Sequence, residues 1–200
     1  MIIVMTGTPG VGKSTISKLL ALRLGAVHMD LSELALREGL TLGWDEERET
    51  AIADIERLKA LFEERVSASE HPFIVEGHYA SDVVPPDKAT FVFVLRKDPW
   101  RLKRELESRG YSMEKVMENV EAEVLDVCLA EAVATYGEDR VSEIDVTDES
   151  AEAVVEKIVS IIEGGKPTGV GKVDWLSKPG VERLLEGTFW EQEEREPASL

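Results

Sequence analysis

The sequence predicts an α/β protein in which helices cover both faces of a parallel sheet. Short apolar runs recur along the chain, and each is followed by helical periodicity or helix-start residues. A glycine-rich stretch stands between the first run and the first helical segment. Strands that alternate with helices in this way pair in parallel. The predicted strands lie at 2–5, 26–29, 73–76, 90–95 and 141–146.

The glycine-rich stretch is the strongest functional signal in the chain. Residues 7–14 fit the phosphate-binding pattern G-x-x-x-x-G-K-[ST] between a strand and a helix. Its three glycines permit backbone conformations in which successive N–H groups converge on phosphate oxygens. The helix N-terminus behind the loop adds a positive field. We therefore expect a bound triphosphate, with Lys13 at the β- and γ-phosphates and the Ser14 hydroxyl on Mg²⁺.

The later helices are predicted from capping residues at their starts and glycines at their ends. We expect helices at 100–108 after Asp98-Pro99, at 112–136 between Ser112 and Gly137, and from Thr147 or Asp148 to Gly164-Gly165. These elements complete one domain over 1–163, since 200 residues suffice for a single substantial core.

Two segments interrupt this alternation and are candidate substrate-binding parts. In the long stretch from Asp30 to Ser69 we expect a short helical segment, a tip at 39–44 and an acid-rich helix from about Asp45. Its length suits an arm that binds a substrate. The link 108–112 joins two helices through a glycine that can act as a hinge, so the link is a candidate lid.

A carboxylate ends the third predicted strand, where that strand emerges beside the phosphate-binding loop. The carboxylate is Glu76, and His78 follows two residues later. Glu76 is placed to hold Mg²⁺ through water or to orient an attacking water, and His78 faces the same side if the chain stays extended. The alternatives are a surface acid for Glu76 and a capping or packing role for His78.

Arginines cluster after the fourth predicted strand, and their planar guanidinium groups suit phosphate oxygens. The cluster begins at Arg96. Arg109 is the best lid candidate, because the glycine beside it would let the side chain swing over the phosphates. Arg101 and Arg104 have glutamates nearby and are more simply explained as solvated ion-pair partners.

The arm carries candidates for acceptor binding. Arg37 and Arg48 could meet the acceptor's phosphate, and the alternative for each is an ordinary surface charge. Trp44 and Tyr111 could stack on nucleotide bases, although single aromatic side chains more often pack in a core or at a tip. The acidic run 45–47 resembles a metal cluster only superficially, because Asp and Glu favour helix starts.

The composition argues against several classes of protein. A net charge of −17 does not suit a protein that binds nucleic acid by neutralising phosphates. A basic protein partner or a salty cytoplasm would fit such acidity. The single asparagine, Asn119, is followed by Val120, so the Asn-Lys-x-Asp element of regulatory GTPases is absent.

Other features of the sequence predict a cytoplasmic location. Cys128 is the single cysteine, so the chain can form no internal disulfide. The sequence begins with a strand instead of a signal segment, and no apolar run reaches membrane-spanning length. We therefore expect a soluble protein without a membrane partner.

The tail 164–200 has a different composition from the rest of the chain. It is rich in Gly, Lys and Pro, and carries Trp175-Leu176, an amphipathic turn near 179–186 and Phe189-Trp190. Isolated aromatic side chains anchor a polar tail only if they find a pocket. The sequence leaves two alternatives open for the tail: a strap that docks on the domain, or a partly disordered extension.

Taken together, these motifs resemble the adenylate kinase isoenzyme 6 family, nucleoside monophosphate (NMP) kinase-like P-loop ATPases of eukaryotes and archaea. The resemblance spans about residues 1–160, and the spacing from Arg-Gly-Tyr to Glu-Asn is its most specific part. The matching motifs are Thr6-Gly-Thr-Pro-Gly-Val-Gly-Lys-Ser-Thr15, Gly43-Trp-Asp-Glu-Glu47, Glu76-Gly-His78, Phe91-Val-Phe-Val-Leu-Arg96, and Arg109-Gly-Tyr111 with Lys115, Glu118-Asn119 and Ala122-Glu123.

The resemblance implies a three-layer NMP-kinase fold with a five-stranded parallel sheet, an NMP-binding arm near 30–53 and a short lid near 108–118. It implies ATP contacts at Gly10, Gly12, Lys13, Ser14, Thr15 and Arg109. The family's Asp-x-His element reads Glu-x-His here, which changes the reach of the carboxylate at position 76 by one methylene.

By the same resemblance we expect a Mg²⁺-dependent ATP:NMP phosphotransferase with weak and broad NMP kinase activity, AMP as the favoured acceptor, and intrinsic ATPase activity. The family also implies a basic ribosomal protein, uS11, as partner in maturation of the small ribosomal subunit and its 16S rRNA. An acidic surface could shield such a protein by imitating the charge of RNA. Two alternatives stay open: a small-metabolite kinase of shikimate-kinase type, and a nucleotide-switched assembly factor with vestigial kinase chemistry.

Overall fold

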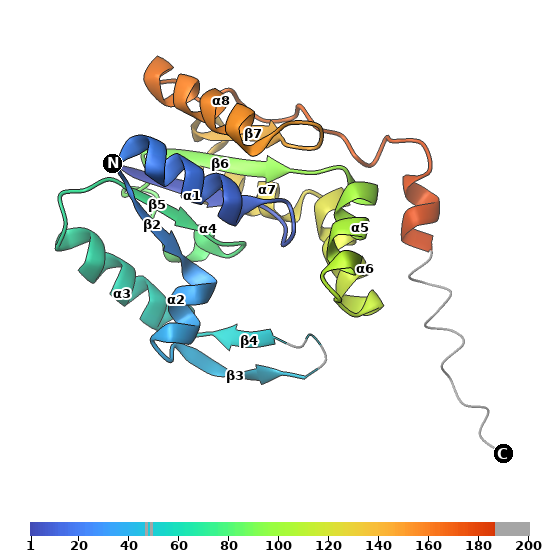
Figure 1. Cartoon of the computed structure of the whole chain (residues 1–200), viewed down its shortest axis with the longest axis horizontal. Coiled ribbons are helices and arrows are strands. Elements are labelled where there is room, and N and C mark those ends of the chain that lie inside the picture. Colours follow the sequence, from blue (N-terminus) through green and yellow to red (C-terminus); the bar gives the residue numbers. More distant parts are fainter. Residues whose placement is uncertain (47, 49, 187–200) are drawn as a thin grey trace.

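A five-stranded parallel sheet forms the centre of the molecule, in the order β2-β5-β1-β6-β7 (Figure 1). This computed structural model describes residues 1–46, 48 and 50–186. The strands are β1 (Ile2–Thr6), β2 (Val27–Asp30), β5 (Phe73–Glu76), β6 (Phe91–Arg96) and β7 (Val141–Asp145). The predicted α/β class and five-stranded parallel sheet are confirmed, and each strand lies within about a residue of its predicted position.

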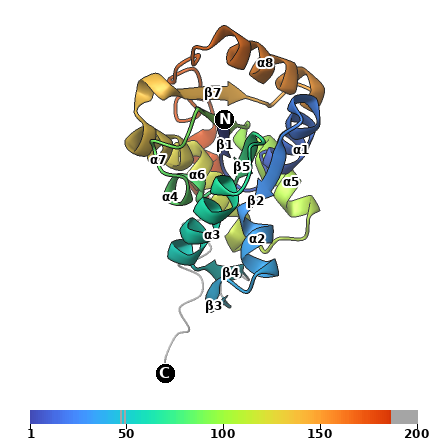
Figure 2. The ribbon, with the colours of Figure 1, turned by 90° about the vertical axis from the view of Figure 1, so that its left-hand side faces the viewer.

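Helices cover both faces of this sheet. The described helices are α1 (Lys13–Leu24), α2 (Leu31–Arg37), α3 (Ile55–Ser67), α4 (Ala80–Val83), α5 (Pro99–Ser108), α6 (Met113–Val124), α7 (Val127–Tyr136) and α8 (Ala151–Gly164), with a 3₁₀ turn at Glu138–Arg140. Figure 2 shows α1 on one side of the sheet and α4 and α7 on the other. Among the described residues, no helix is long and apolar enough to cross a membrane.

The alternating side chains of β1 divide the core into two layers. Ile3 and Met5 pack in a cluster with α1, α5, α6 and α8. Ile2 and Val4 pack on the opposite face with α2, α3, α4 and α7. Every residue of β1 is buried, as expected for the central strand of a doubly covered parallel sheet.

The arm contains a β-hairpin where we expected a tip and an acid-rich helix. β3 (Thr41–Asp45) pairs antiparallel with β4 (Thr50–Ala53), so the prediction of a helix from about Asp45 is wrong. The Asp45 side chain instead accepts from the backbone N–H of Arg48 at 3.0 Å, which stabilises a turn. Asp54 caps α3, and the helix therefore starts only at Ile55.

The helix expected over 112–136 is two helices. Asp126 has a left-handed φ of 57° and separates α6 from α7. Its carboxylate pairs with Arg96 at the end of β6, and this tertiary contact compensates for a conformation unfavourable to a residue with a Cβ. The two helices therefore leave the break in different directions (Figure 1).

The last helix of the sheet domain starts later than predicted. Ser150 caps α8 by accepting from the backbone N–H of Ala153 at 3.2 Å. Thr147, one of the two expected starts, instead accepts from the backbone N–H of Asp98 at 2.8 Å and belongs to the preceding loop. Gly165 ends α8 in a left-handed conformation, at the predicted stop.

Residues 165–186, here called the strap, run from α8 along the edge of the sheet to α5 (Figure 1). Trp175, Val181 and Leu184 are buried in the same core cluster as α5 and α6. Residues 181–186 are helical. Phe189 and Trp190 lie outside the described residues.

Candidate nucleotide site

The phosphate-binding loop joins β1 to α1 in a backbone conformation that requires glycine. Gly7, Gly10 and Gly12 have φ angles of 138°, 93° and 109°. A Cβ atom at Gly7 would lie 2.4 Å from the carbonyl oxygen of Leu95, and one at Gly10 would lie 2.7 Å from the Leu106 side chain. The loop is therefore pressed against β6 and α5, and a side chain at either position would displace it.

Lys13, the first residue of α1, closes the loop on itself. Its Nζ donates to the carbonyl oxygens of Gly7 at 2.6 Å and Thr8 at 3.1 Å. Burial lowers the pKa of Lys13, although the carboxylates of Glu76 and Glu123 act in the opposite direction. The amino group is thus held at the loop, where a phosphate oxygen could exchange for these carbonyls.

Ser14 and Glu76 meet beside the loop. Ser14 Oγ donates to Oε2 of Glu76 at 3.1 Å, and the exposed Thr15 follows in the first turn of α1. Glu76 ends β5, the sheet neighbour of β1, and is 2% exposed. A hydroxyl and a carboxylate are hard oxygen ligands of the kind that Mg²⁺ accepts together with water and phosphate oxygens. This pair therefore fits a Mg²⁺ ion that arrives with a nucleotide.

This donor set is not a self-sufficient metal centre. Across the described part of the chain, no group of three or more His, Cys, Asp or Glu side chains could hold a metal ion. A site with one carboxylate and one hydroxyl depends on phosphate oxygens for its remaining ligands, which is the usual arrangement for Mg²⁺ at nucleotides.

Sequence reasoning missed His28, the second partner of Glu76. His28 lies on β2, and its Nε2 is 2.7 Å from Oε1 of Glu76. β2 and β5 are adjacent, with Asp30 opposite Glu76 in the register. Strand order brings the two side chains together, and no local pattern in the sequence marks it. With Oε1 occupied by His28, Glu76 presents Oε2 to Ser14.

His78 follows β5 at the exposed surface of the site. Although its side chain is accessible, the surrounding protein desolvates the ring, and this effect, followed by repulsion from Lys13, lowers the pKa of His78 to about 4. The ring packs edge-on against Tyr79, with centroids 4.5 Å apart. His78 is therefore neutral at pH 7 and adds no positive charge beside Lys13.

The candidate lid residue Arg109 directly follows α5 as its C-terminal cap and pairs with Glu105 of that helix. Its Nε and Nη2 donate to Glu105 Oε1 at 3.0 and 2.8 Å, and this contact lowers the pKa of Glu105. Arg101 forms an exposed ion pair with Asp148 at 2.7 Å. A cavity of about 610 Å³ lies along this face of α5, lined by Lys97, Arg101, Arg104, Glu105, Ser108 and Thr147.

Arg96 is not available to a phosphate, contrary to its place in the arginine cluster. It is 1% exposed and pairs with Glu123 at 2.8 Å, with Glu143 at 2.6 Å, and with Asp126. Burial acts to lower the pKa of Arg96, but Glu123 and Asp126 outweigh it and raise the pKa. Arg96 therefore serves as a buried structural cation directly behind the loop.

Glu123, which sequence reasoning did not single out as a site residue, links this cation to the phosphate-binding loop. Its Oε2 accepts from Thr8 Oγ1 at 2.6 Å, and its Oε1 accepts from Arg96 Nε at 2.8 Å. Thr8 and Glu123 are both buried. The sequence does contain a signal for this role, since Glu123 lies within a helix of apolar periodicity. An ionised residue on the buried face of such a helix requires a partner.

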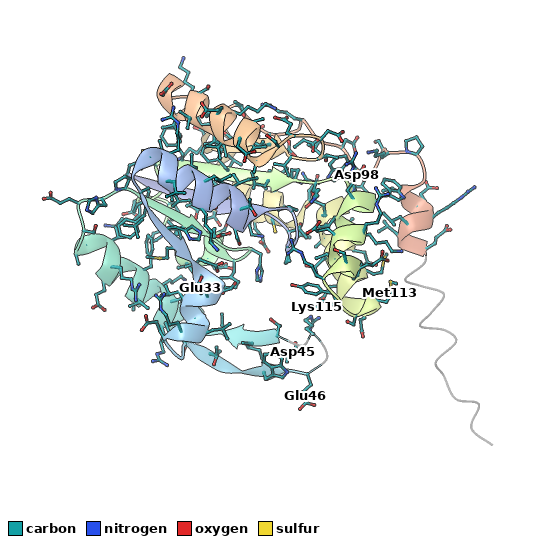
Figure 3. The ribbon with its side chains drawn as sticks, viewed as in Figure 1. Glu33, Asp45, Glu46, Asp98, Met113 and Lys115 are labelled. Carbon is teal, nitrogen blue, oxygen red and sulfur yellow. The ribbon has the colours of Figure 1, made fainter. Side chains whose placement is uncertain are left out.

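The arm and α6 contact each other through charged side chains. Arg48 Nε donates to Glu118 of α6 at 2.8 Å, and Arg48 Nη1 donates to Asp45 at 3.2 Å. Figure 3 shows Asp45 and Lys115 on these two facing elements. The structure places Arg48 opposite the expected lid.

The other two arm candidates lie apart from this contact. Trp44 is 61% exposed on β3. Arg37 pairs with the adjacent Glu38 at 3.4 Å. In this arrangement neither side chain contacts the phosphate-binding loop, so an acceptor role for them depends on a movement of the arm.

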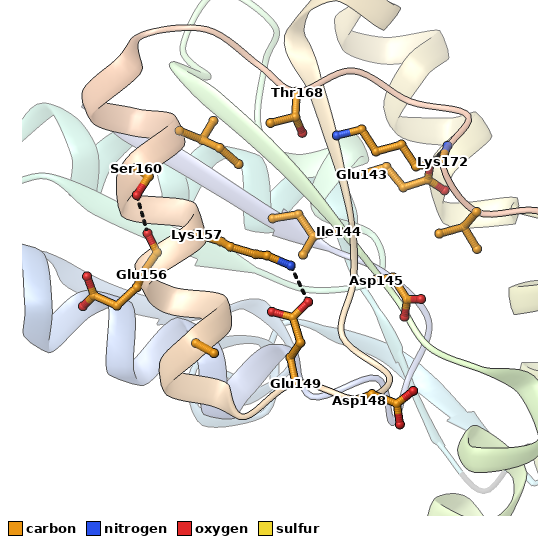
Figure 4. Close-up of a pocket in the computed structure, with 13 residues that line it drawn as sticks. Glu143, Ile144, Asp145, Asp148, Glu149, Glu156, Lys157, Ser160, Thr168 and Lys172 are labelled. Atoms are coloured by element: carbon orange, nitrogen blue, oxygen red, sulfur yellow. Dashed lines mark hydrogen bonds and ion pairs between the residues drawn. The ribbon is translucent and has the colours of Figure 1, made fainter.

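A second cavity, of about 860 Å³, lies between β7, α8 and the strap (Figure 4). Lys157 and Glu149 form an ion pair in its wall. Its lining, which includes Glu143, Asp145, Lys172 and Thr168, contains none of the residues that the sequence patterns assign to a nucleotide. This cavity is therefore separate from the candidate nucleotide site.

Comparisons with known sequences show one matching protein family and similar archaeal proteins. A family described as an AAA domain (AAA_18) matches residues 3–126. A Methanocaldococcus jannaschii protein named "Putative adenylate kinase" is 40% identical over 178 residues, which cover 89% of this chain and 94% of that protein. A protein of the same name from Natronomonas pharaonis is 41% identical over 175 residues, covering 88% and 98%.

Solved structures share the fold at much lower sequence identity. Shikimate kinase from Acinetobacter baumannii, solved with shikimate, aligns with a TM-score of 0.57 at 22% identity, over 82% of this chain and 94% of that one. Shikimate kinase from Bacteroides thetaiotaomicron aligns with a TM-score of 0.51 at 17% identity, over 82% and 98%. These likenesses establish the kinase-type α/β fold alone.

Proposed function

This chain belongs to the AAA_18 family and to the family of archaeal proteins named "Putative adenylate kinase", and we propose that it transfers the γ-phosphoryl group of ATP to a nucleoside monophosphate. AMP is the expected acceptor, and water is the acceptor in a slower ATPase reaction. The observation that carries the proposal is the convergence of Lys13, Ser14 and Glu76 at one end of the glycine loop. We further propose a cytoplasmic site of action.

Phosphoryl transfer requires mainly positioning and neutralisation of charge. The N–H groups of the loop and the Lys13 ammonium would bind the β- and γ-phosphates, together with Gly10, Gly12 and Thr15. Ser14 and Glu76 would hold the Mg²⁺ ion that ATP brings, and that ion would neutralise charge on the phosphate oxygens. His28 would keep the Glu76 carboxylate oriented toward Ser14.

The remaining contacts would form when both substrates are present. Arg109 would exchange Glu105 for a phosphate oxygen, since the existing pair is exposed and easily broken. Arg37 and Arg48 would bind the acceptor's phosphate, and Trp44 would stack on its base. Neutral His78 would line the site beside Lys13 without competing for the same anion.

The proposed function is tested by offering ATP and Mg²⁺ with AMP, CMP or shikimate in separate coupled assays. We expect phosphorylation of AMP, with weaker use of CMP. Phosphorylation of shikimate and not AMP would overturn the proposal in favour of a small-metabolite kinase. The variant Lys13→Ala should lose activity by at least about 100-fold, because it removes the positive side chain at the phosphates.

We also propose that a basic ribosomal protein of the uS11 type is a partner, in keeping with a role in 16S rRNA maturation. The supporting observation is the net charge of −17, which would attract and shield a basic RNA-binding surface. A pull-down with purified uS11 at moderate salt should recover the complex, and no binding there would remove this part of the proposal. If wild-type protein binds uS11 and ATP but does not phosphorylate AMP, it acts as a nucleotide-switched assembly factor.

A further inference from the structure

The strap is attached to the sheet domain by specific polar contacts as well as by apolar packing. Its first attachment is to β7, where the backbone N–H of Lys172 donates to Glu143 Oε2 at 2.7 Å (Figure 4). The backbone N–H of Thr168 donates to Ser142 Oγ at 3.0 Å. The strap then reaches α5, where Lys178 forms an ion pair with Asp98. These contacts fix the strap at both ends of its path.

The central attachment of the strap is to Glu123, the residue that holds the phosphate-binding loop. The indole Nε1 of Trp175 donates to Glu123 Oε1 at 3.0 Å, and Trp175 is 7% exposed. The ammonium of Lys178 lies over the Trp175 ring, 4.9 Å from its centre, and this cation–π contact also holds the ring. The strap thus delivers a fixed N–H donor to a buried carboxylate.

Four donors share the two oxygens of Glu123. Oε1 accepts from Trp175, from Arg96 Nε at 2.8 Å and from the backbone N–H of Lys97 at 3.0 Å, whereas Oε2 accepts, among the residues that the structure describes, only from Thr8 Oγ1 at 2.6 Å. A carboxylate is planar, so the donors on Oε1 determine where Oε2 lies. The Thr8 hydroxyl follows Oε2, and the Thr8 carbonyl oxygen is one of the two acceptors of Lys13 Nζ.

From this geometry we infer that Trp175 is a positioning residue for nucleotide binding, acting through Glu123 and Thr8 on the phosphate-binding loop. The strap is therefore part of the nucleotide site, although none of its residues is placed at the phosphates. The inference depends on the proposed function only in requiring that the loop binds a nucleotide. It does not depend on which acceptor, if any, receives the phosphoryl group.

The test measures the dissociation constant of Mg²⁺–ADP by calorimetry for Trp175→Phe, Thr8→Val and the double variant. Trp175→Phe keeps an aromatic ring but removes the indole N–H together with part of the ring volume, and the control below makes the same change of volume. A change of Glu123 would also disturb Arg96. We expect the dissociation constant to rise about tenfold for Thr8→Val and about threefold for Trp175→Phe. Because both act through Glu123, the double variant should show a rise well below the product of about 30-fold.

Trp100→Phe is the matched control. Trp100 also lies under Lys178, with 5.6 Å between the ammonium and the ring centre, and it packs against the same core. Within the part of the chain that the structure describes, its indole N–H has no hydrogen-bond acceptor. Trp100→Phe should leave the dissociation constant unchanged, and combined with Thr8→Val it should add nothing to the effect of Thr8→Val.

Three outcomes would overturn the inference. An unchanged dissociation constant in Trp175→Phe, even with a lower melting temperature, would make Trp175 a packing residue only. A double variant that reaches the full product would show that Trp175 does not act through Glu123. If wild-type protein does not bind ADP, the proposed function fails together with this inference. If it binds ADP but does not phosphorylate AMP, only the proposed function fails.

Discussion

The nucleotide side and the acceptor side of the candidate site are held together in different ways. Behind the glycine loop the contacts are buried, as in the Arg96–Glu123 pair, whose side chains are 2% and 1% exposed. On the acceptor side the arm contacts α6 through the Arg48–Glu118 pair, with side chains 52% and 48% exposed. Exposed pairs contribute about 0–1 kcal/mol, whereas breaking a buried pair costs several times more.

This difference indicates which half of the site is preformed. In the proposed triphosphate half, hydrogen bonds hold the loop, Lys13 and the carboxylates of Glu76 and Glu123 in place. The acceptor half is linked by a contact that a substrate phosphate can replace at little cost. We therefore expect ATP to bind to an existing surface, and the arm and lid to rearrange when the acceptor binds.

The largest expected effect is on stability, from Arg96→Met. The change leaves Glu123 and Glu143 buried without their cation and should lower the free energy of unfolding by about 3–5 kcal/mol. Urea denaturation measures it. The control Arg101→Met breaks an exposed pair with Asp148 and should cost less than about 1 kcal/mol. Equal costs for the two variants would remove the distinction between buried and exposed contacts.

The next effect is on catalysis, from Glu76→Gln. The amide keeps the shape and one oxygen but loses the negative charge that would hold Mg²⁺, so kcat for AMP phosphorylation should fall by about 100-fold or more. Steady-state kinetics at saturating ATP and Mg²⁺ measure this. Glu64→Gln, on the exposed face of α3, is the control and should behave like wild type. A kcat within a few-fold of wild type would exclude Glu76 from the reaction.

A third prediction compares the reactivity of a buried thiol, Cys128 of α7, with that of a thiol placed on the exposed arm. Burial raises the pKa of Cys128 to about 11 from an ordinary value of 9. Below pH 9 the native thiol therefore ionises far less than the unfolded thiol, and alkylation at pH 8 should be slower by about 100-fold or more in the native protein. A cysteine placed at Leu42 on the arm, 70% exposed, in a Cys128→Ser background should react at nearly the unfolded rate.

The smallest expected effects are on the KM for AMP. Substitution of Arg48 in the arm should raise it, and substitution of its partner Glu118 should lower it. Arg48→Met should raise the KM for AMP by about threefold, because it removes a cation proposed to bind the acceptor. Glu118→Gln should lower that KM slightly, because it removes one of the two ion pairs of Arg48 and leaves the pair with Asp45. Added salt should reduce the effect of Glu118→Gln, since exposed charges are screened. Changes of the same sign in both variants would rule out competition between Glu118 and the substrate.

The parts of the fold that were predictable from sequence are those encoded by local patterns. The glycine spacing of residues 7–14 and the apolar runs of the strands are such patterns, and the structure places the loop and all five strands where they predict. Asp98-Pro99 likewise gave the start of α5. Each signal lies within a few residues of the element it specifies.

The features that sequence reasoning missed depend on contacts between distant residues. The break at Asp126 exists because Arg96 lies opposite it, 30 residues earlier in the chain. His28 meets Glu76 only because β2 lies beside β5. The arginine cluster suggested a phosphate role for Arg96, but the acids that enclose it come from other elements. A charged residue has the same appearance in the sequence whether its partner is a substrate or a buried carboxylate.

The position of β1 at the centre of the sheet also constrains how the protein folds. β1 precedes both of its partners in the chain, and it pairs with residues 73–76 on one side and with 91–94 on the other. During synthesis the apolar segment Ile2–Thr6 therefore remains without a β-partner until about 70 further residues have emerged, and without its second partner until about 90 have emerged. Such long-range pairing slows folding and leaves an aggregation-prone strand exposed in the meantime. β1, which leads into the phosphate-binding loop, is thus the segment of the nascent chain most exposed to aggregation.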